Sequence, residues 1–176
     1  MTEQKDESTT VPFLPELWRG QCLNVFARVE DAVIRALEAA VEGELTRKIP
    51  HLAGQRLAVL EILARQASFT DKQRERFEAV MADWKAIEAK RLFLAHGVAT
   101  AARENNGAWI VLFDVTVYRA NRPLHDRWAI KQSEAIAFAK ELTAAHAKVC
   151  QQLGILRVQK FGAEKKALPD PNEGST

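Results

Sequence analysis

The most informative part of this chain is the stretch Lys90-Arg91-Leu92-Phe93-Leu94-Ala95-His96-Gly97. It places an arginine five positions before a histidine, and a glycine follows directly. The stretch lies within a pattern of apolar residues spaced three and four positions apart, which predicts one long helix from about Asp71 to Ala102. Arg91 shares the apolar side of this helix, where arginine is unusual. The sequence therefore predicts its functional site in this segment.

Two further helices are expected upstream. Apolar residues recur at helical spacing from about Leu17 to Val41, and again from about Gly54 to Gln66. Gly43 and Pro50 mark the break between the two segments. Residues 1–12 are mostly polar, and we expect them to be disordered.

The character of the sequence changes downstream of the long helix. Asn105-Asn106-Gly107 is expected to end that helix and turn the chain. Residues 109–118 are rich in β-branched and aromatic side chains, which suit a strand. A return strand completes a β-hairpin at about residues 108–130. Ser133 is then a suitable N-cap for a last amphipathic helix that ends near Gly154.

These patterns predict a mainly α fold, a helical bundle of four or more helices with an inserted β-hairpin. A chain of 176 residues, with 47% hydrophobic and 27% charged residues, is typical of one globular domain. We place this domain at residues 13–156. Residues 157–176 end in a segment rich in Pro, Asp, Gly and Ser, and we expect them to form a mobile tail.

Composition and missing motifs exclude several function classes. The formal net charge of +2 is too small for a protein that coats nucleic acid, although a local RNA contact stays open. Cys22 and Cys150 are expected to be plain core thiols, and the histidines lack ligand spacing, so we expect no metal and no cofactor. No signal peptide and no apolar run of membrane-spanning length is visible, which predicts a soluble cytoplasmic protein without a membrane partner.

The Arg91 and His96 pair suits cleavage of RNA without a metal ion. The ribose 2′-hydroxyl has to lose a proton as it attacks the adjacent phosphate, and histidine, with a reference pKa of about 6.5, exchanges protons near neutral pH. Arginine can pair with the phosphate while charge develops there. On a straight helix, five residues correspond to about 140° of rotation and about 7.5 Å of rise. A kink near His96-Gly97 would bring the two side chains closer, and so would a two-fold axis that brings two copies of the pair into one groove. We expect the homodimer, because the apolar seam that flanks Arg91 is typical of a packing surface.

The string Arg91-x-x-x-x-His96-Gly97 resembles the R-x4-6-H signature of the HEPN superfamily of helical proteins. The segment that ends in Ala95-His96-Gly97 fits the end of the family's Arg-Asn-x-x-x-His-Gly-like string, and the order of the expected elements fits as well. The resemblance covers about residues 17–155 in architecture and is specific over Arg91 to Gly97. One position departs from the family, because active members usually have a polar residue where this chain has Leu92.

The resemblance implies a helical bundle that dimerises, with the motif lining a cleft between the subunits. Many members are metal-independent endoribonucleases in toxin, antiphage or RNA-processing systems, and others are non-catalytic binding modules. Carried over to this chain, Arg91 would bind the scissile phosphate and His96 would transfer protons. Three functions stay open: a homodimeric endoribonuclease acting on RNA, a non-catalytic interaction or regulatory module with a protein partner, and a helical regulator unrelated to this family. Leu92 favours the second function, whereas the intact Arg91 and His96 favour the first.

Simpler roles for the same residues also stay open. Arg91 can form a salt bridge with Glu88 or Asp83, its neighbours on the helix. His96 can be a histidine on the side of the helix, hydrogen-bonded to backbone. The four tryptophans can stack bases, but positions inside apolar stripes are more typical of a core: Trp18, Trp84, Trp109 and Trp128.

Overall fold

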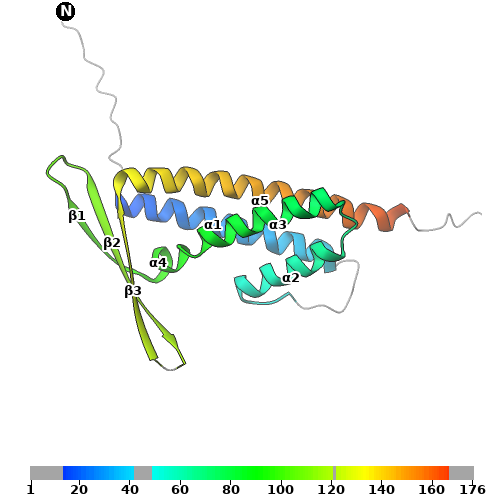
Figure 1. The fold of residues 1–176 in the computed structure, drawn as a ribbon, viewed down its shortest axis with the longest axis horizontal. Helices are drawn as coiled ribbons and strands as arrows, with labels where there is room; N and C mark the ends of the chain where they lie inside the picture. The colour runs from blue at the N-terminus through cyan, green and yellow to red at the C-terminus, as the bar shows by residue number, and fades with distance from the viewer. Residues whose placement is uncertain (1–13, 42–48, 121, 167–176) are drawn as a thin grey trace, which may run out of the picture.

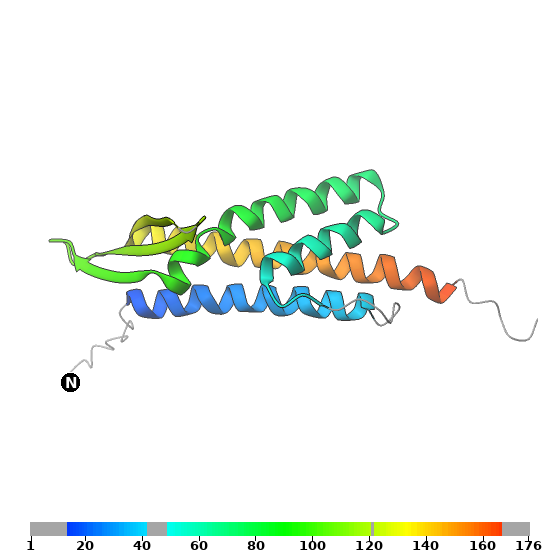
Figure 2. The same cartoon turned by 90° about the horizontal axis from the view of Figure 1, so that it is seen from below.

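The computed structural model describes residues 14–41, 49–120 and 122–166. In this part of the chain, four long helices lie side by side and a small sheet sits at one end of the bundle (Figures 1 and 2). The helices of the bundle are α1 (Pro15–Val41), α2 (Ala53–Gln66), α3 (Asp71–Glu88) and α5 (Gln132–Lys166). The remaining elements are the short helix α4 (Arg91–His96) and the strands β1 (Val98–Arg103), β2 (Trp109–Arg119) and β3 (Arg122–Lys131). The expected mainly α class is therefore confirmed.

The core of the bundle follows from the apolar periodicity of the helices. In α1, the buried side chains recur every three or four residues and form one stripe: Trp18, Cys22, Phe26, Val29, Val33 and Leu37. This stripe packs mainly against α5, whose Leu142 and Val149 are fully buried. Burying each large apolar side chain contributes about 1.5–3 kcal/mol. Three of the tryptophans, Trp18, Trp84 and Trp109, are buried, which agrees with a core role.

The prediction of one helix from Asp71 to Ala102 is wrong. Helix α3 begins with a capping box between Thr70 and Gln73, but it ends at Glu88, and α4 covers only the six residues that end at His96. The chain then continues as β1. The alanines of β1 have high helix propensity, and pairing with the neighbouring strand overrides this local preference.

The predicted hairpin is part of a larger sheet. Three antiparallel strands lie in the order β1-β2-β3, so β2 is central. The Asn105-Asn106-Gly107 turn does not end a helix but joins β1 to β2, and Gly107 has a φ of +84°, which favours glycine. The inner face of β2 packs on α1 through a ring cluster, in which Trp18 lies 6.3 Å from Phe113 and 5.9 Å from Trp109.

The last helix is longer than the sequence indicated. Helix α5 continues through Gly154 to Lys166 instead of ending at Gly154, because an isolated glycine only weakens a helix. Part of the segment expected to be a tail is therefore helical. Ser133 is not the N-cap, since α5 begins at Gln132; Glu134 instead accepts a hydrogen bond from the Lys131 amide, at 2.9 Å. The expectations for residues 1–12 and 167–176 concern positions outside the described residues.

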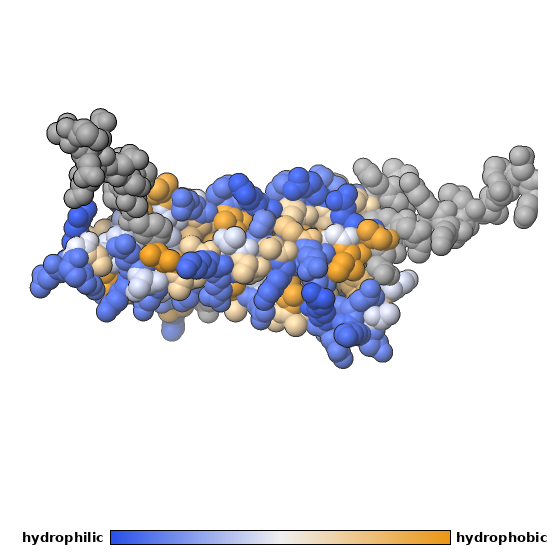
Figure 3. All heavy atoms as spheres, turned by 90° about the horizontal axis from the view of Figure 1, so that it is seen from above, coloured by the Kyte–Doolittle hydropathy of each residue, from blue (hydrophilic) through white to orange (hydrophobic). Residues whose placement is uncertain are grey.

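The surface of the bundle is mixed in character. On the face shown in Figure 3, small apolar patches alternate with hydrophilic side chains along the helices. Within the described ranges, no helix combines the length and the apolar character that crossing a membrane requires.

Candidate functional site

Helix α4 places the motif at the junction between the bundle and the sheet. Phe93 and Leu94 are buried in the core, and Leu92 packs against it while half-buried. Arg91 at the start of α4 is half-buried, whereas His96 at its end is exposed. The apolar middle of the motif thus anchors α4, and the two polar residues mark its ends.

Gly97 permits the close contact at which α4 ends and β1 begins. Its backbone is in the ordinary extended region, so positive φ is not the reason for glycine here. A Cβ atom at this position would lie 2.4 Å from the Phe93 carbonyl oxygen and 3.1 Å from the Phe113 Cβ. Any side chain would therefore push α4 away from β2. The glycine of the motif has a structural reason that is independent of chemistry.

Arg19, a residue that sequence reasoning missed, fixes the C-terminal end of α4. Its Nε donates to the Leu94 carbonyl at 2.6 Å, and its Nη2 donates to the Gly97 carbonyl at 3.2 Å. The guanidinium also lies 5.6 Å from the centre of the Phe113 ring. A cation at the C-terminal end of a helix is stabilising, because the last carbonyls lack helical partners. This residue joins α1, α4 and the sheet.

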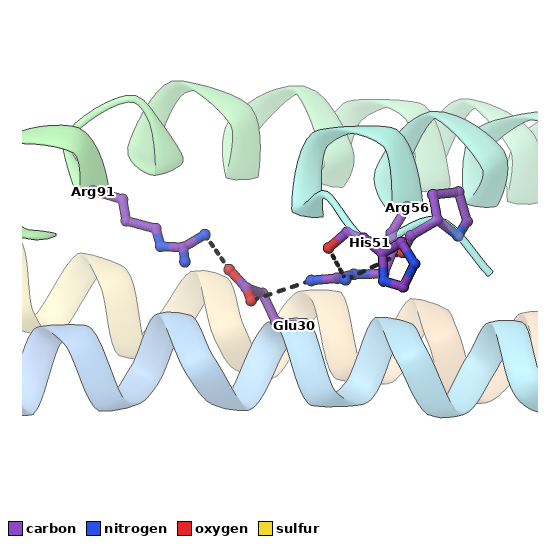
Figure 4. Close-up of polar contacts among 5 residues, drawn as sticks. Glu30, His51, Arg56 and Arg91 are labelled. Atoms are coloured by element: carbon purple, nitrogen blue, oxygen red, sulfur yellow. Dashed lines mark hydrogen bonds and ion pairs between the residues drawn. The ribbon is translucent and has the colours of Figure 1, made fainter. Parts of the chain in front are cut away.

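Arg91 forms an ion pair with Glu30 on α1. Figure 4 shows Glu30 between two arginines, Arg91 from α4 and Arg56 from α2. The second contact joins Arg56 Nη2 to Glu30 Oε2 at 3.4 Å. Arg56 also donates to the His51 carbonyl at 2.6 Å. The Glu30 carboxylate therefore ties three helices together.

The prediction that Arg91 can be salt-bridged is confirmed, but the partner is Glu30 and not Glu88 or Asp83. Arg91 also affects the pKa of Glu88. Burial raises the pKa of Glu88, whereas the nearby guanidinium of Arg91 lowers it. A cavity of only about 10 Å³ lies beside Glu30, Arg56 and Glu88. This volume is at the lower limit for one water molecule, so the side chains around Glu30 are closely packed on that side.

His96 lies apart from this ion pair. Its side chain is exposed, and no hydrogen bond or ion pair joins it to another residue within the described ranges. Arg91 extends toward α1, while His96, five residues along the same short helix, is directed about 140° away around the helix axis. One copy of the chain therefore does not bring the two predicted site residues to one point.

Neither thiol nor metal chemistry adds a site in the described part of the chain. Burial raises the pKa of Cys22 to about 12 and also raises that of Cys150, so both thiols stay protonated near neutral pH. Within the same residues, no group of three or more His, Cys, Asp or Glu side chains is placed to hold a metal ion.

Strand β1 is a second candidate site that sequence reasoning missed. All six of its residues are exposed, and β2 is the one strand that pairs with it among the described residues (Figure 1). The Glu104 amide donates to the Ala108 carbonyl at 2.7 Å, so the backbone groups of Glu104 point toward β2. In an antiparallel ladder, the backbone groups of successive residues point alternately toward the neighbouring strand and away from it. Counting back from Glu104, the backbone N–H and C=O groups that point away from β2 belong to Ala99, Ala101 and Arg103. We call this row of groups the β1 edge.

The two outer strands of the sheet differ in chemistry. Strand β3, at the opposite side, has Pro123 and several charged residues, which are the usual means by which edge strands avoid further pairing. Strand β1 contains three alanines, a valine and a threonine, and its one charge, Arg103, is at its end. The β1 edge thus lacks the features that block addition of another strand.

Comparison with protein-family models, with curated proteins and with solved structures finds no match to this chain.

Proposed function

We propose that this chain is a non-catalytic protein-interaction module, which offers the β1 edge to a strand of its partner. The observation behind the proposal is that β1 is exposed along its whole length and pairs on one side only within the described residues. An added strand gains main-chain hydrogen bonds to such an edge, and this is a general mode of peptide recognition. The proposal corresponds to the second of the two functions that the HEPN resemblance implies.

The surroundings of the motif support a structural role for it. The charge of Arg91 is already matched by Glu30, and Leu92 packs against the core. Gly97 is required for a close contact between α4 and β2. Two of the residues that carry the resemblance, Arg91 and Gly97, thus contribute to the junction between helices and sheet. His96 is the remaining one.

The test is capture of partner proteins from a lysate of the source cells by the wild-type chain and by Ala101→Pro. Proline removes the N–H that points along the β1 edge, and it leaves the ladder to β2 intact because that N–H makes no bond there. Ala101→Thr is the matched control, since it keeps the N–H and suits a strand. We expect Ala101→Pro to lose the proteins that wild type and Ala101→Thr both retain. Equal capture by all three variants would contradict the proposal.

The second candidate function is the metal-independent endoribonuclease. It is favoured by the exposed imidazole of His96, which has no partner among the described residues, and by Arg91, whose side chain keeps 35% of its surface exposed. In this function, Arg91 would leave Glu30 to bind the scissile phosphate of RNA, and His96 would transfer the proton. A second copy of the chain would have to complete the groove.

Incubation with structured and unstructured RNA in EDTA separates the two candidates. If the chain is a nuclease that uses these residues, the wild-type protein cleaves RNA, whereas His96→Ala and Arg91→Ala do not. Cleavage that persists in either variant excludes this mechanism. The interaction module predicts no cleavage by any of the three proteins.

A further inference from the structure

We propose that the partner strand is β1 of a second copy of this chain, paired antiparallel about a two-fold axis at Ala101. This inference rests on the proposed function, because it assigns an occupant to the β1 edge. The register of the two strands follows from the backbone groups of β1 that have no partner within the described residues.

The available backbone groups restrict the register. The backbone groups of Ala99, Ala101 and Arg103 point away from β2. Those of Gly97, the preceding residue in this alternation, already form hydrogen bonds within the chain. Its N–H donates to the Phe93 carbonyl at 2.9 Å, and its carbonyl accepts from Arg19. An axis at Ala101 pairs Ala99 with Arg103 of the second copy, Ala101 with its own counterpart, and Arg103 with Ala99. This register uses every free residue of the β1 edge, and each such pair exchanges two hydrogen bonds.

The side chains fit this register. Ala101 meets its own counterpart at the axis, and Thr100 lies opposite Ala102 of the second copy, so small residues face each other. No like charges meet, because Arg103 lies opposite Ala99 and Glu104 lies opposite Val98. Glu104 also comes within two residues of His96 of the second copy. A two-fold axis repeats each of these favourable pairs, so the sequence of β1 is compatible with a second copy of itself.

The inner face of the sheet has room for side chains of an added strand beside the end of β1. A hollow of about 460 Å³ lies between the end of β1 and the first residues of α1. Ala101 and Arg103 line this hollow. They pair with Val111 and Trp109 of β2, which are buried, so all four side chains lie on the inner face of the sheet. Figures 1 and 2 show β1 at the end of the molecule, where it extends beyond the long helices. The bundle therefore leaves the approach to the β1 edge open.

This pairing has a consequence for the motif. In the proposed register, His96 of one copy lies opposite Asn106 of the other, so the two His96 residues are separated by ten residue positions. At about 3.4 Å per residue this is on the order of 30 Å. The pair of histidines therefore does not share one groove. The strand-paired dimer and the nuclease groove are distinguishable by where the two copies touch.

Disulfide formation between single cysteines tests the register directly. In a Cys150→Ser background, we compare Ala101→Cys, Ala99→Cys and His96→Cys after mild oxidation, on a non-reducing gel. Hydrogen-bonded antiparallel pairs have Cα atoms about 5.5 Å apart, within the 4.4–6.8 Å that disulfides span. Two copies of residue 99 are separated by about 14 Å in this register. We expect a cross-linked dimer from Ala101→Cys, at least tenfold above the other two variants.

The remaining outcomes separate this inference from the proposed function. Cross-linking of His96→Cys in place of Ala101→Cys overturns the β1 pairing and favours the shared groove. Absence of cross-linking, together with protein capture that Ala101→Pro abolishes, overturns self-pairing but keeps the interaction module. If both results are negative, both proposals fail. Circular dichroism of each variant confirms that the helices remain folded.

Discussion

At the scale of single residues, Arg91 is the position where the structure changes the interpretation of the sequence most. The sequence presents it as a cation in an apolar seam, which suits a phosphate ligand. The structure places its charge against Glu30, which Arg56 also contacts. Glu30 and Arg56 lie on other helices, so no local pattern in the sequence joins them to Arg91. The sequence therefore identifies Arg91 as an unusual arginine, but it does not reveal that Glu30 is its partner.

A double-mutant cycle measures whether Arg91 serves the bundle. We expect Glu30→Gln and Arg91→Gln each to lower the free energy of unfolding, and the double variant to lower it by less than the sum. The coupling should be on the order of 1 kcal/mol, at the upper end for a partly exposed pair because Glu30 is half-buried. Urea unfolding of the four proteins gives this value. Additive losses would show that the ion pair contributes nothing to stability.

Gly97 gives a second prediction at the same scale. Gly97→Ala forces a Cβ against the Phe93 carbonyl, so we expect a loss of about 1–3 kcal/mol in the free energy of unfolding. Gly154→Ala is the matched control, because a Cβ there meets no atom within 4 Å. In a helix interior this change should stabilise by about 0.5–1 kcal/mol. Thermal unfolding compares the two, and equal shifts of Tm in one direction would contradict the close contact.

At the scale of elements, the helices that pack through a continuous apolar stripe were predictable. The stripes of α1 and α2 gave these helices nearly correct bounds, because burial and helical period act together in both. Strand β1 was not predictable, since its alanines favour a helix locally and its exposure leaves no alternation of apolar and polar residues. Its strand conformation comes from the ladder to β2, which one sequence does not reveal.

Amide hydrogen exchange tests the alternation along β1. In dilute protein, we expect fast exchange at Ala99, Ala101 and Arg103, whose N–H groups form the β1 edge, and slower exchange at Thr100 and Ala102. Rising protein concentration should slow the fast group, because the second copy then supplies acceptors. The measurement is residue-resolved exchange by NMR. Uniform rates along β1 would be inconsistent with the assigned ladder.

At the scale of the whole molecule, the chain combines a bundle with a separate sheet at one end (Figure 1). Nearly all the apolar burial serves the bundle and its contact with β2, while β1 contributes no buried residue. The β1 strand therefore adds little to the core and leaves its own edge free within the described residues. This division favours a stable helical body that presents a binding strand.

Sedimentation of the wild-type chain and of Ala101→Pro at about 100 μM is the most direct test of the claim that two copies pair through the β1 edge. The account predicts a dimer mass for wild type and a monomer mass for Ala101→Pro, with the same helical circular dichroism for both. The same mass for the two proteins would contradict it.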